Sequence, residues 1–253
     1  MARISKGAFR LHKWIVRKFP ILLLNWALRY FPILRVLKGR MAAGDWLLDI
    51  GSGSFGLAAF YKHRFVGCDL EFPWPPRKPM LPVRCSATKL PFDDASFPAV
   101  VASDVLEHVA PEQRLAVVRE ALRVTGKVAV FGFPSGSCAE ECDRHFHDYL
   151  KERGIPPYGW LEEHLRYPFP DRTLFDGLPP EWSVESFGNE NVEFHLWVHR
   201  RELSRITRVL FWILLTIVPR PLEALIRLAD RSPFYRMIVV VTRKPQGSDA
   251  PAC

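Results

Sequence analysis

The chain lacks most of the features that assign a sequence to a class at first sight. Its five cysteines form an odd, scattered set in 253 residues, which excludes a disulfide framework and favours a reducing compartment. It has no internal repeat, and no low-complexity tract apart from a short polar tail after Pro245. The apolar run VLFWILLTIVP, residues 209–219, has eleven residues, whereas a membrane-spanning helix needs about 20. The length fits one globular domain with additions.

Acidic side chains are absent from residues 1–44, which carry ten Lys or Arg. Residues 45–199 contain fifteen Lys or Arg and twenty-three Asp or Glu, a net charge of −8. Residues 200–253 contain ten Lys or Arg and four Asp or Glu, a net charge of +6. An acidic middle between two basic, aromatic-rich flanks indicates that the flanks form a shared surface.

The first flank has the periodicity of an amphipathic helix. Its cations recur at steps of three and four and share one helical face, while apolar side chains line another. Such a helix suits a membrane interface with anionic headgroups, and a helix packed on the domain is the alternative. The segment lacks a small-residue cleavage site, so a secretory signal is not expected, and a transit peptide is the weaker alternative. The cations of this face are Arg3, Lys6, Arg10, Lys13 and Arg17.

A glycine loop opens the middle segment. The apolar run at residues 46–50 is typical of a buried parallel strand, and Gly51, Gly53 and Gly56 follow it. A helix-like pattern and a second apolar run then end on Asp69. A strand, a glycine turn, a helix and a strand ending in a carboxylate form a nucleotide-binding βαβ unit, in which the acid accepts hydrogen bonds from a ribose diol.

Asp49 bears on the choice of ligand. It stands two residues before the first glycine, where a carboxylate would face a pyrophosphate at the helix N-terminus. A negative charge there disfavours a dinucleotide and favours a ligand that carries a cation, such as S-adenosylmethionine. The alternative is that Asp49 only caps the following turn.

Residues 85–109, CSATKLPFDDASFPAVVASDVLEHV, resemble the class I S-adenosylmethionine-dependent methyltransferases, in the branch with a Leu-Pro-Phe segment before the fourth strand. Residues 123–136 resemble the fifth strand of that family. The resemblance implies a methyltransferase that uses S-adenosylmethionine, with a methionine-side loop, a ribose carboxylate and an adenine contact. The implied cofactor-binding residues are Asp49, Gly51, Ser52, Gly53, Asp69, Leu70, Ser86, Ala87 and Ser103.

The chain departs from the family pattern at three positions. Ser86 stands where members usually have an acid, so the contact to the adenine amino group is expected to be weaker or made by the backbone. Phe55 replaces a common third glycine, although Gly56 follows it. Pro98 replaces the usual acid before the fourth strand, at a strand-entry position that tolerates proline.

The predicted fold is a doubly wound, Rossmann-like α/β domain with a seven-stranded sheet, an N-terminal amphipathic helix and a helical insertion before the last strand. The sixth and seventh strands are expected at residues 181–189 and 237–244, which the family usually joins by a close hairpin. The predicted segments are a basic extension (1–44), a cofactor-binding core (45–189), an insertion serving as a membrane or lid element (190–236), and the last strand with a polar tail (237–253).

Three histidines are the candidates for a catalytic base. An alcohol acceptor needs a general base, most often histidine, whereas a carboxylate or phosphate acceptor needs none. His108 follows the fourth strand, and its alternative role is to support that turn. His145 and His147 follow the fifth strand and are expected on one side of an extended segment facing the acceptor. Cys138 and Cys142 precede them, but this spacing matches no common zinc site, and no metal is predicted.

These patterns predict a peripheral enzyme at the inner, cytoplasmic face of a membrane, which O-methylates a lipid or lipid-linked glycan. Methylation of a soluble small molecule is the main alternative. RNA methylation ranks lower, because the cations alternate with aliphatic runs and no Asn/Asp-Pro-Pro-aromatic motif follows the fourth strand, so no nucleic-acid partner is expected. A non-catalytic membrane module of the same fold and an NAD-dependent oxidoreductase are the remaining alternatives.

Overall fold

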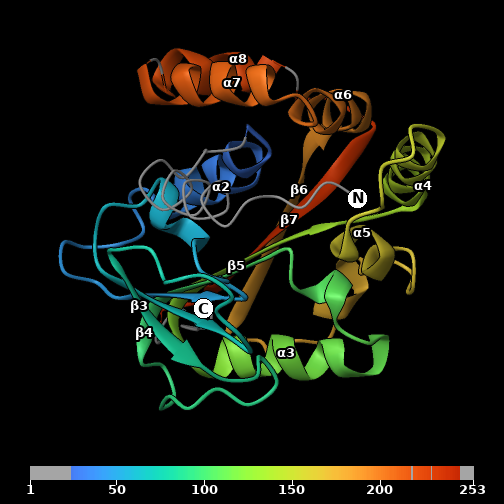
Figure 1. Cartoon of the computed structure of the whole chain (residues 1–253). Coiled ribbons are helices and arrows are strands. Elements are labelled where there is room, and N and C mark those ends of the chain that lie inside the picture. The colour runs from blue at the N-terminus through green and yellow to red at the C-terminus, as the bar shows by residue number, and fades with distance from the viewer. Residues whose placement is uncertain (1–23, 218, 229, 246–253) are drawn as a thin grey trace.

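The computed structural model describes residues 24–217, 219–228 and 230–245, and the basic helix predicted over residues 3–19 lies outside them. A seven-stranded sheet in the order β3-β2-β1-β4-β5-β7-β6 crosses the molecule (Figure 1). Neighbouring strands are parallel, except that β7 is antiparallel to β5 and to β6. This confirms the predicted Rossmann-like sheet. The strands are β1 (Leu47–Ile50), β2 (Phe65–Asp69), β3 (Met80–Arg84), β4 (Phe97–Ser103), β5 (Thr125–Pro134), β6 (Trp182–Asn191) and β7 (Phe234–Arg243).

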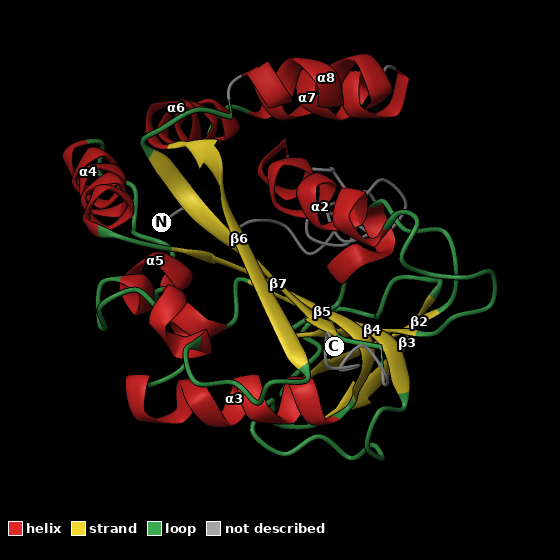
Figure 2. Cartoon of the chain, turned by 180° about the vertical axis from the view of Figure 1, so that it is seen from behind, coloured by secondary structure: helices red, strands yellow, loops and turns green. Residues whose placement is uncertain are grey.

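Helices cover both faces of the sheet (Figure 2). Val117 and Ala121 of α3 pack on one face with Val100, while Ile33 of α2 packs on the other with Val101. Each of these buried aliphatic side chains contributes roughly 1.5–3 kcal/mol, which explains why the central strands are apolar on both faces. The helices are α2 (Leu24–Leu37), α3 (Pro111–Arg123), α4 (Ser137–Glu152), α5 (Gly159–His164), α6 (Val192–Glu202), α7 (Arg205–Ile217) and α8 (Pro219–Leu228), with short 3₁₀ turns η1 (Gly56–Ala59), η2 (Leu106–His108) and η3 (Arg172–Phe175).

The strand order reverses between β1 and β4. The chain turns from β1 towards β2 and β3 on one side, and from β4 towards β5 on the other. Loops that leave the carboxyl ends of two such strands diverge, and the crevice between them is where open α/β sheets bind ligands. The glycine loop after β1 and the turn η2 after β4 therefore border the expected site.

Helix α2 continues through Pro32. Proline has no N–H, so the carbonyl four residues earlier, that of Leu28, loses its helical partner. The Asn189 side chain supplies one, because its Nδ2 donates to the Leu28 carbonyl oxygen at 3.2 Å. An amide from β6 thus compensates for the proline and joins α2 to the edge of the sheet.

The predicted helical insertion before the last strand is confirmed and consists of α6, α7 and α8. Strands β6 and β7 pair along their whole length, from Trp182 opposite Arg243 to Asn191 opposite Phe234. The insertion leaves the end of this hairpin. Because β7 runs antiparallel to β5, that end lies at the carboxyl edge of the parallel strands, so the insertion stands beside the crevice (Figure 1). Among the described residues, no helix is both long and apolar enough to cross a membrane.

Candidate active site

Two adjoining cavities occupy the crevice. The first, of about 560 Å³, lies among the glycine loop, the end of β2 and the turn after β4, and we call it the outer cavity. The second, of about 330 Å³, lies under α2, α5 and α6, and we call it the inner cavity. Trp26, Arg29, Asp104 and His108 line both, so the two spaces meet at the end of β4. This arrangement suits two ligands that react with each other.

The glycine loop packs as closely as its sequence predicted. Gly51, Gly53 and Gly56 have φ values of 70°, 51° and 44°, a region that other residues rarely adopt. A Cβ on Gly51 would stand 2.3 Å from Cγ2 of Val105, in the turn after β4. The loop therefore brings bare backbone to the wall of the outer cavity.

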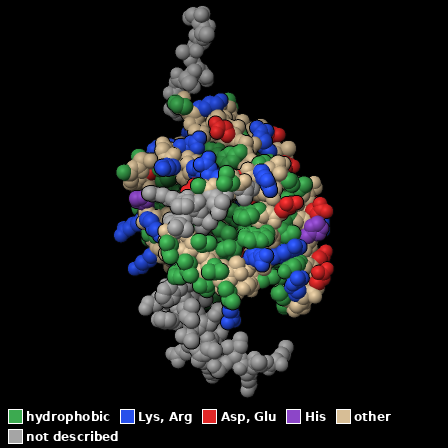
Figure 3. Space-filling view, turned by 90° about the horizontal axis from the view of Figure 1, so that it is seen from above, with side chains coloured by type: hydrophobic (Ala, Val, Ile, Leu, Met, Phe, Trp, Pro, Cys, Tyr) green, Lys and Arg blue, Asp and Glu red, His purple; other side chains and the backbone are tan. Residues whose placement is uncertain are grey.

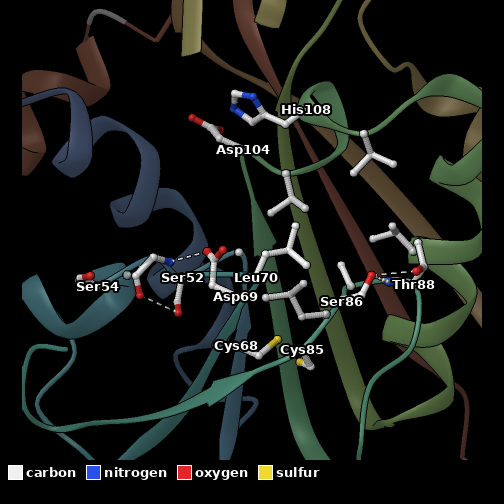
Figure 4. Close-up of a pocket in the computed structure, with 18 of the residues that line it drawn as sticks. Ser52, Ser54, Cys68, Asp69, Leu70, Cys85, Ser86, Thr88, Asp104 and His108 are labelled. Carbon is white, nitrogen blue, oxygen red and sulfur yellow. Dashed lines mark hydrogen bonds between the residues drawn. The ribbon is translucent and has the colours of Figure 1, made fainter. Parts of the chain in front are cut away.

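Asp69 ends β2 and lines the outer cavity, as the ribose-binding prediction requires (Figure 4). Its Oδ2 accepts a hydrogen bond from the Gly53 backbone N–H at 2.7 Å, which fixes the carboxylate against the glycine loop. Its Oδ1 has only a long contact of 3.4 Å with the Glu71 N–H. One carboxylate oxygen is thus available to accept hydrogen bonds from a ligand diol.

Asp49 does not line either cavity, contrary to the prediction that it contacts the ligand. Its side chain is buried behind the loop, and Oδ2 accepts from the Leu57 N–H at 2.9 Å at the start of η1. Burial raises the pKa of Asp49 to about 7, against the effects of the Leu57 hydrogen bond and of Arg29. The structure favours the capping alternative for this residue.

The other predicted cofactor-binding residues divide into two groups. Ser52, Leu70, Ser86 and Ala87 line the outer cavity, and Leu70 is 65% exposed at its mouth. Ser103, in contrast, is buried and lines neither cavity. The Ser86 hydroxyl shares a 2.8 Å hydrogen bond with that of Thr88, a lining residue that sequence reasoning missed (Figure 4). Where the family has an acid, this chain therefore offers a pair of hydroxyls.

A buried arginine organises the floor of the inner cavity. Arg236 of β7 donates from Nε and Nη2 to Asp104 at 3.0 and 2.9 Å, and from Nη1 to Glu190 at 2.5 Å. Arg29 of α2 adds a second ion pair to Asp104 at 2.6 Å. Burial acts to raise the pKa of Asp104, but Arg236 and Arg29 outweigh it and hold that pKa well below its ordinary value. Both acids are therefore ionised at neutral pH.

The two acids that hold Arg236 have unusual backbone conformations. Asp104 has φ 52° and Glu190 has φ 64°, a left-handed region that costs of order 1–3 kcal/mol for residues other than glycine. Their ion pairs with the buried guanidinium oppose that cost. Strained residues gather at functional sites. Here Asp104 directly follows β4 and Glu190 lies one residue before the end of β6, and both line the inner cavity.

Aromatic and imidazole rings extend this network. His195 bonds Glu190 through Nδ1 at 2.8 Å, and its ring stacks on Tyr235 with 3.5 Å between centroids. The Tyr235 hydroxyl donates to Asp143 at 3.0 Å, and Asp143 also bonds Nδ1 of His164 at 2.7 Å. Glu190, His195, Tyr235, Asp143 and His164 are all buried, so this hydrogen-bonded network sets the shape of the inner cavity rigidly.

Two titratable groups beside this hydrogen-bonded network have strongly shifted pKa values. Burial lowers the pKa of His199 far below its ordinary value, with His195 and Arg236 acting in the same direction. Burial raises the pKa of Glu107, as does the charge of Asp104. Neither carboxylate oxygen of Glu107 has a hydrogen-bond partner among the described residues. Groups of this kind in a cleft mark functional sites.

Only one of the three predicted catalytic histidines lies in the site. His108 lines both cavities, and its Nδ1 bonds Glu163 Oε2 at 2.7 Å. Burial lowers the pKa of His108, His164 lowers it further, and Glu163 opposes both. The ring is therefore neutral near pH 7.

The prediction for His145 and His147 was wrong. Residues 137–152 form helix α4 and not an extended segment, so side chains two residues apart point in different directions. His145 lies on the surface near Glu141, and neither histidine lines a cavity. Cys142 is buried on the same helix, and its thiol contacts the Val192 carbonyl oxygen at 3.4 Å.

Sequence reasoning missed most of the inner cavity. Arg29, Asp104, Glu190 and Arg236 come from distant parts of the chain and share no local spacing that would connect them. The one local signal is the polar segment around His164. Its histidine does line the inner cavity.

Comparison with known proteins bears on this geometry. Residues 48–131 match the family model described as methyltransferase domain. A comparison with curated protein sequences finds no match.

Similar solved structures include a putative sarcosine dimethylglycine methyltransferase from Galdieria sulphuraria (13% identity, 87% of this chain and 84% of that chain, TM-score 0.49). Another is the magnesium protoporphyrin IX methyltransferase from Synechocystis PCC 6803 with bound SAH (12% identity, 96% and 90%, TM-score 0.44). A third comes from a study of the conversion of a disulfide bond into a thioacetal group during echinomycin biosynthesis (14% identity, 86% and 82%, TM-score 0.48). At these identities the likeness concerns the fold alone.

Proposed function

We propose that this chain, a class I S-adenosylmethionine-dependent methyltransferase, works at a membrane surface and methylates a hydroxyl of a lipid or lipid-linked glycan. The outer cavity holds the methyl donor and the inner cavity receives the acceptor. The observation that carries the membrane part of this proposal is an exposed apolar face on α7.

The outer cavity fits S-adenosylmethionine. Asp69 has a carboxylate oxygen available for the ribose, the glycine loop brings backbone to the cavity wall, and Leu70 at the mouth is the residue that would cover the adenine. When bound, the donor supplies a methyl group on a sulfonium. The chain contributes alignment, since holding two reactants in line removes much of the entropic barrier.

His108 is the residue placed to act on the acceptor proton. It stands where the two cavities meet, and Glu163 holds its Nδ1, which leaves Nε2 for a hydroxyl. Its lowered pKa keeps the ring neutral, as a proton acceptor must be. Buried acids and arginines around the inner cavity would orient the other polar groups of a headgroup or sugar.

Helix α7 presents apolar side chains to solvent on one face. Ile206, Leu210 and Ile217 are 74%, 53% and 71% exposed. Figure 3 looks onto this side of the molecule, and hydrophobic side chains gather there with Lys and Arg among and around them. Soluble monomers rarely expose such contiguous apolar surface unless it contacts a membrane or a partner. Nearby exposed cations, Arg205 and Arg227, favour anionic headgroups.

An apolar groove of about 800 Å³ is lined by residues of α6, α7 and α8. Helix α6 separates it from the inner cavity: Phe194 and Trp197 line the groove, whereas His195 and His199 line the inner cavity. One helix thus has a polar face towards the reaction and an apolar face towards the groove. A lipid acceptor would keep acyl chains on the groove side and bring its polar part to His108.

Co-sedimentation with vesicles tests the membrane step. The triple variant Ile206→Ser, Leu210→Ser, Ile217→Ser removes the exposed apolar face, so binding to vesicles that contain anionic lipid should fall at least about tenfold, since each buried side chain contributes over 1 kcal/mol. Binding should also weaken with salt, because the cations near a surface contribute roughly 1 kcal/mol each.

A matched control uses exposed apolar residues on other elements. Leu81 on β3, Leu115 on α3 and Phe187 on β6 are 43%, 38% and 41% exposed. Their serine variants should bind vesicles as the natural chain does. Equal binding by both triple variants, or equal binding to zwitterionic vesicles, would refute the proposed surface.

A further inference from the structure

Three metal-binding side chains lie close together beside the junction of the two cavities: His108 lines both cavities, His164 lines the inner one, and Glu107 is buried next to them. Glu107 and His108 come from the turn after β4, and His164 ends α5. One ligand atom from each residue lies within 4.8 Å of the others, and Glu107 Oε1 stands 3.8 Å from His164 Nε2. Two atoms that bind one ion at about 2.0–2.2 Å can be up to about 4.4 Å apart, so only small side-chain movements are needed.

Each histidine is already oriented as a ligand. Nδ1 of His108 bonds Glu163 and Nδ1 of His164 bonds Asp143, both at 2.7 Å. Metal-binding histidines almost always bond a carboxylate or carbonyl with the nitrogen that does not face the ion. Here that arrangement occurs twice and leaves Nε2 of each ring for an ion, and Nε2 of His164 stands 3.8 Å from Glu107 Oε1.

Glu107 touches no Lys or Arg, although the charges of Arg29, Arg236 and Arg114 reach it at longer range. It is 1% exposed, and neither carboxylate oxygen has a hydrogen-bond partner among the described residues. The arginines of the inner cavity bond Asp104 and Glu190, and no Lys or Arg in the described part of the chain forms an ion pair with Glu107. A buried, unpartnered carboxylate is costly, and a bound cation would remove that cost.

We propose that Glu107, His108 and His164 bind one divalent transition-metal ion between the two cavities. Two imidazoles with one carboxylate suit Zn²⁺, Mn²⁺ or Fe²⁺, whereas Mg²⁺ and Ca²⁺ prefer oxygen ligands throughout. Three protein ligands leave positions open for an exogenous oxygen.

The use of those open positions rests on the proposed function. With an ion bound, His108 would hold the ion instead of taking the proton itself, and the ion would supply the lowered pKa of an acceptor hydroxyl at its open position, whose proton would pass to solvent. Metal binding itself requires neither the membrane nor the acceptor, so it is measured separately from the methylation reaction.

The test is titration of the metal-free protein with Zn²⁺ and with Mn²⁺, followed by calorimetry, and the visible spectrum with Co²⁺. We expect one equivalent of Zn²⁺ or Mn²⁺ to bind. Glu107→Gln and His108→Gln should each weaken binding at least about tenfold. Glu163→Gln, at a half-exposed residue that touches the ion only through His108, should weaken it by about 10–100-fold.

Two histidines of α4 provide the control. His145→Gln and His147→Gln remove imidazoles outside both cavities and should leave the stoichiometry and affinity unchanged. Circular dichroism checks that Glu107→Gln is folded, and the more exposed His108 and Glu163 variants test the site if it is not. The proposal is overturned if no ion binds stoichiometrically, or if binding survives His108→Gln and Glu163→Gln undiminished.

Discussion

Replacement of Arg236 by methionine tests how the inner cavity is held together. Arg236 is 4% exposed and makes three hydrogen bonds to Asp104 and Glu190. Methionine keeps most of the volume but removes the charge, so two buried acids lose a partner. Breaking a buried ion pair from one side costs about 3–5 kcal/mol. Arg29 still pairs with Asp104 and His195 with Glu190, which places the expected loss near 3 kcal/mol.

Urea unfolding and thermal melting measure this loss. For a chain of this size, a loss of about 3 kcal/mol corresponds to a fall of roughly 6–12 °C in Tm. The control is Arg243→Met on the same strand, where the guanidinium lies over the Trp182 ring and makes no ion pair within the described chain. That change should cost about 1 kcal/mol or less.

The pH dependence adds an independent check. Arg236 helps to hold the pKa values of Asp104 and Glu190 below their ordinary values despite burial. Acids with lowered pKa stabilise the folded state above their unfolded pKa of about 4, and the contribution is lost as the pH falls below it. The deficit of Arg236→Met should therefore be full at pH 7 and shrink below about pH 4. A deficit no larger than that of Arg243→Met, or one independent of pH, would contradict this account of the buried network.

Three further outcomes are expected. Asp69→Ala should weaken S-adenosylmethionine binding by roughly 2–4 kcal/mol in calorimetry, as a carboxylate that accepts ribose hydroxyls is lost, whereas the exposed Asp148→Ala should not. Gly51→Ala should lower donor affinity and Tm more than Gly136→Ala, because both have positive φ but only the first adds a Cβ that collides with a neighbour. Because the pKa of Asp49 is raised in the folded state, its protonation stabilises the fold below about pH 4, and this contribution is lost as the pH rises to about 7. Asp49→Asn should therefore make Tm depend less on pH over that range. An unchanged dependence of Tm on pH would exclude this effect.

Local motifs were the part of the site that the sequence could predict. The loop from Gly51 to Gly56 and the carboxylate of Asp69 belong to one βαβ unit, where spacing along the chain determines spacing in the fold. The Rossmann-like sheet followed from the strand pattern and the family resemblance, and the insertion from the long connection between the sixth and seventh strands. The role of Asp49 was harder to predict, because a carboxylate beside a glycine turn either faces the ligand or caps the turn. Only its hydrogen bond from the Leu57 N–H distinguishes the two roles.

The inner cavity could not be predicted in this way. Its central pairs join Arg236 to Asp104 and to Glu190, across 132 and 46 residues, and depend on β7 returning beside β5. His145 and His147 were misplaced because Gly136, with φ 83°, starts a helix directly after β5. Nor does the local sequence indicate that α2 continues through Pro32, because the compensating amide of Asn189 comes from a strand more than 150 residues away.

The transfer of a labelled methyl group tests the central claim most directly. Purified protein, S-adenosylmethionine labelled in its methyl group and a fractionated cell extract with membranes are incubated together, and the label is followed into organic and aqueous phases. The account predicts label in the organic phase, as a methyl ether, with the natural chain and its loss with Asp69→Ala. Label confined to aqueous small molecules or to RNA would contradict it.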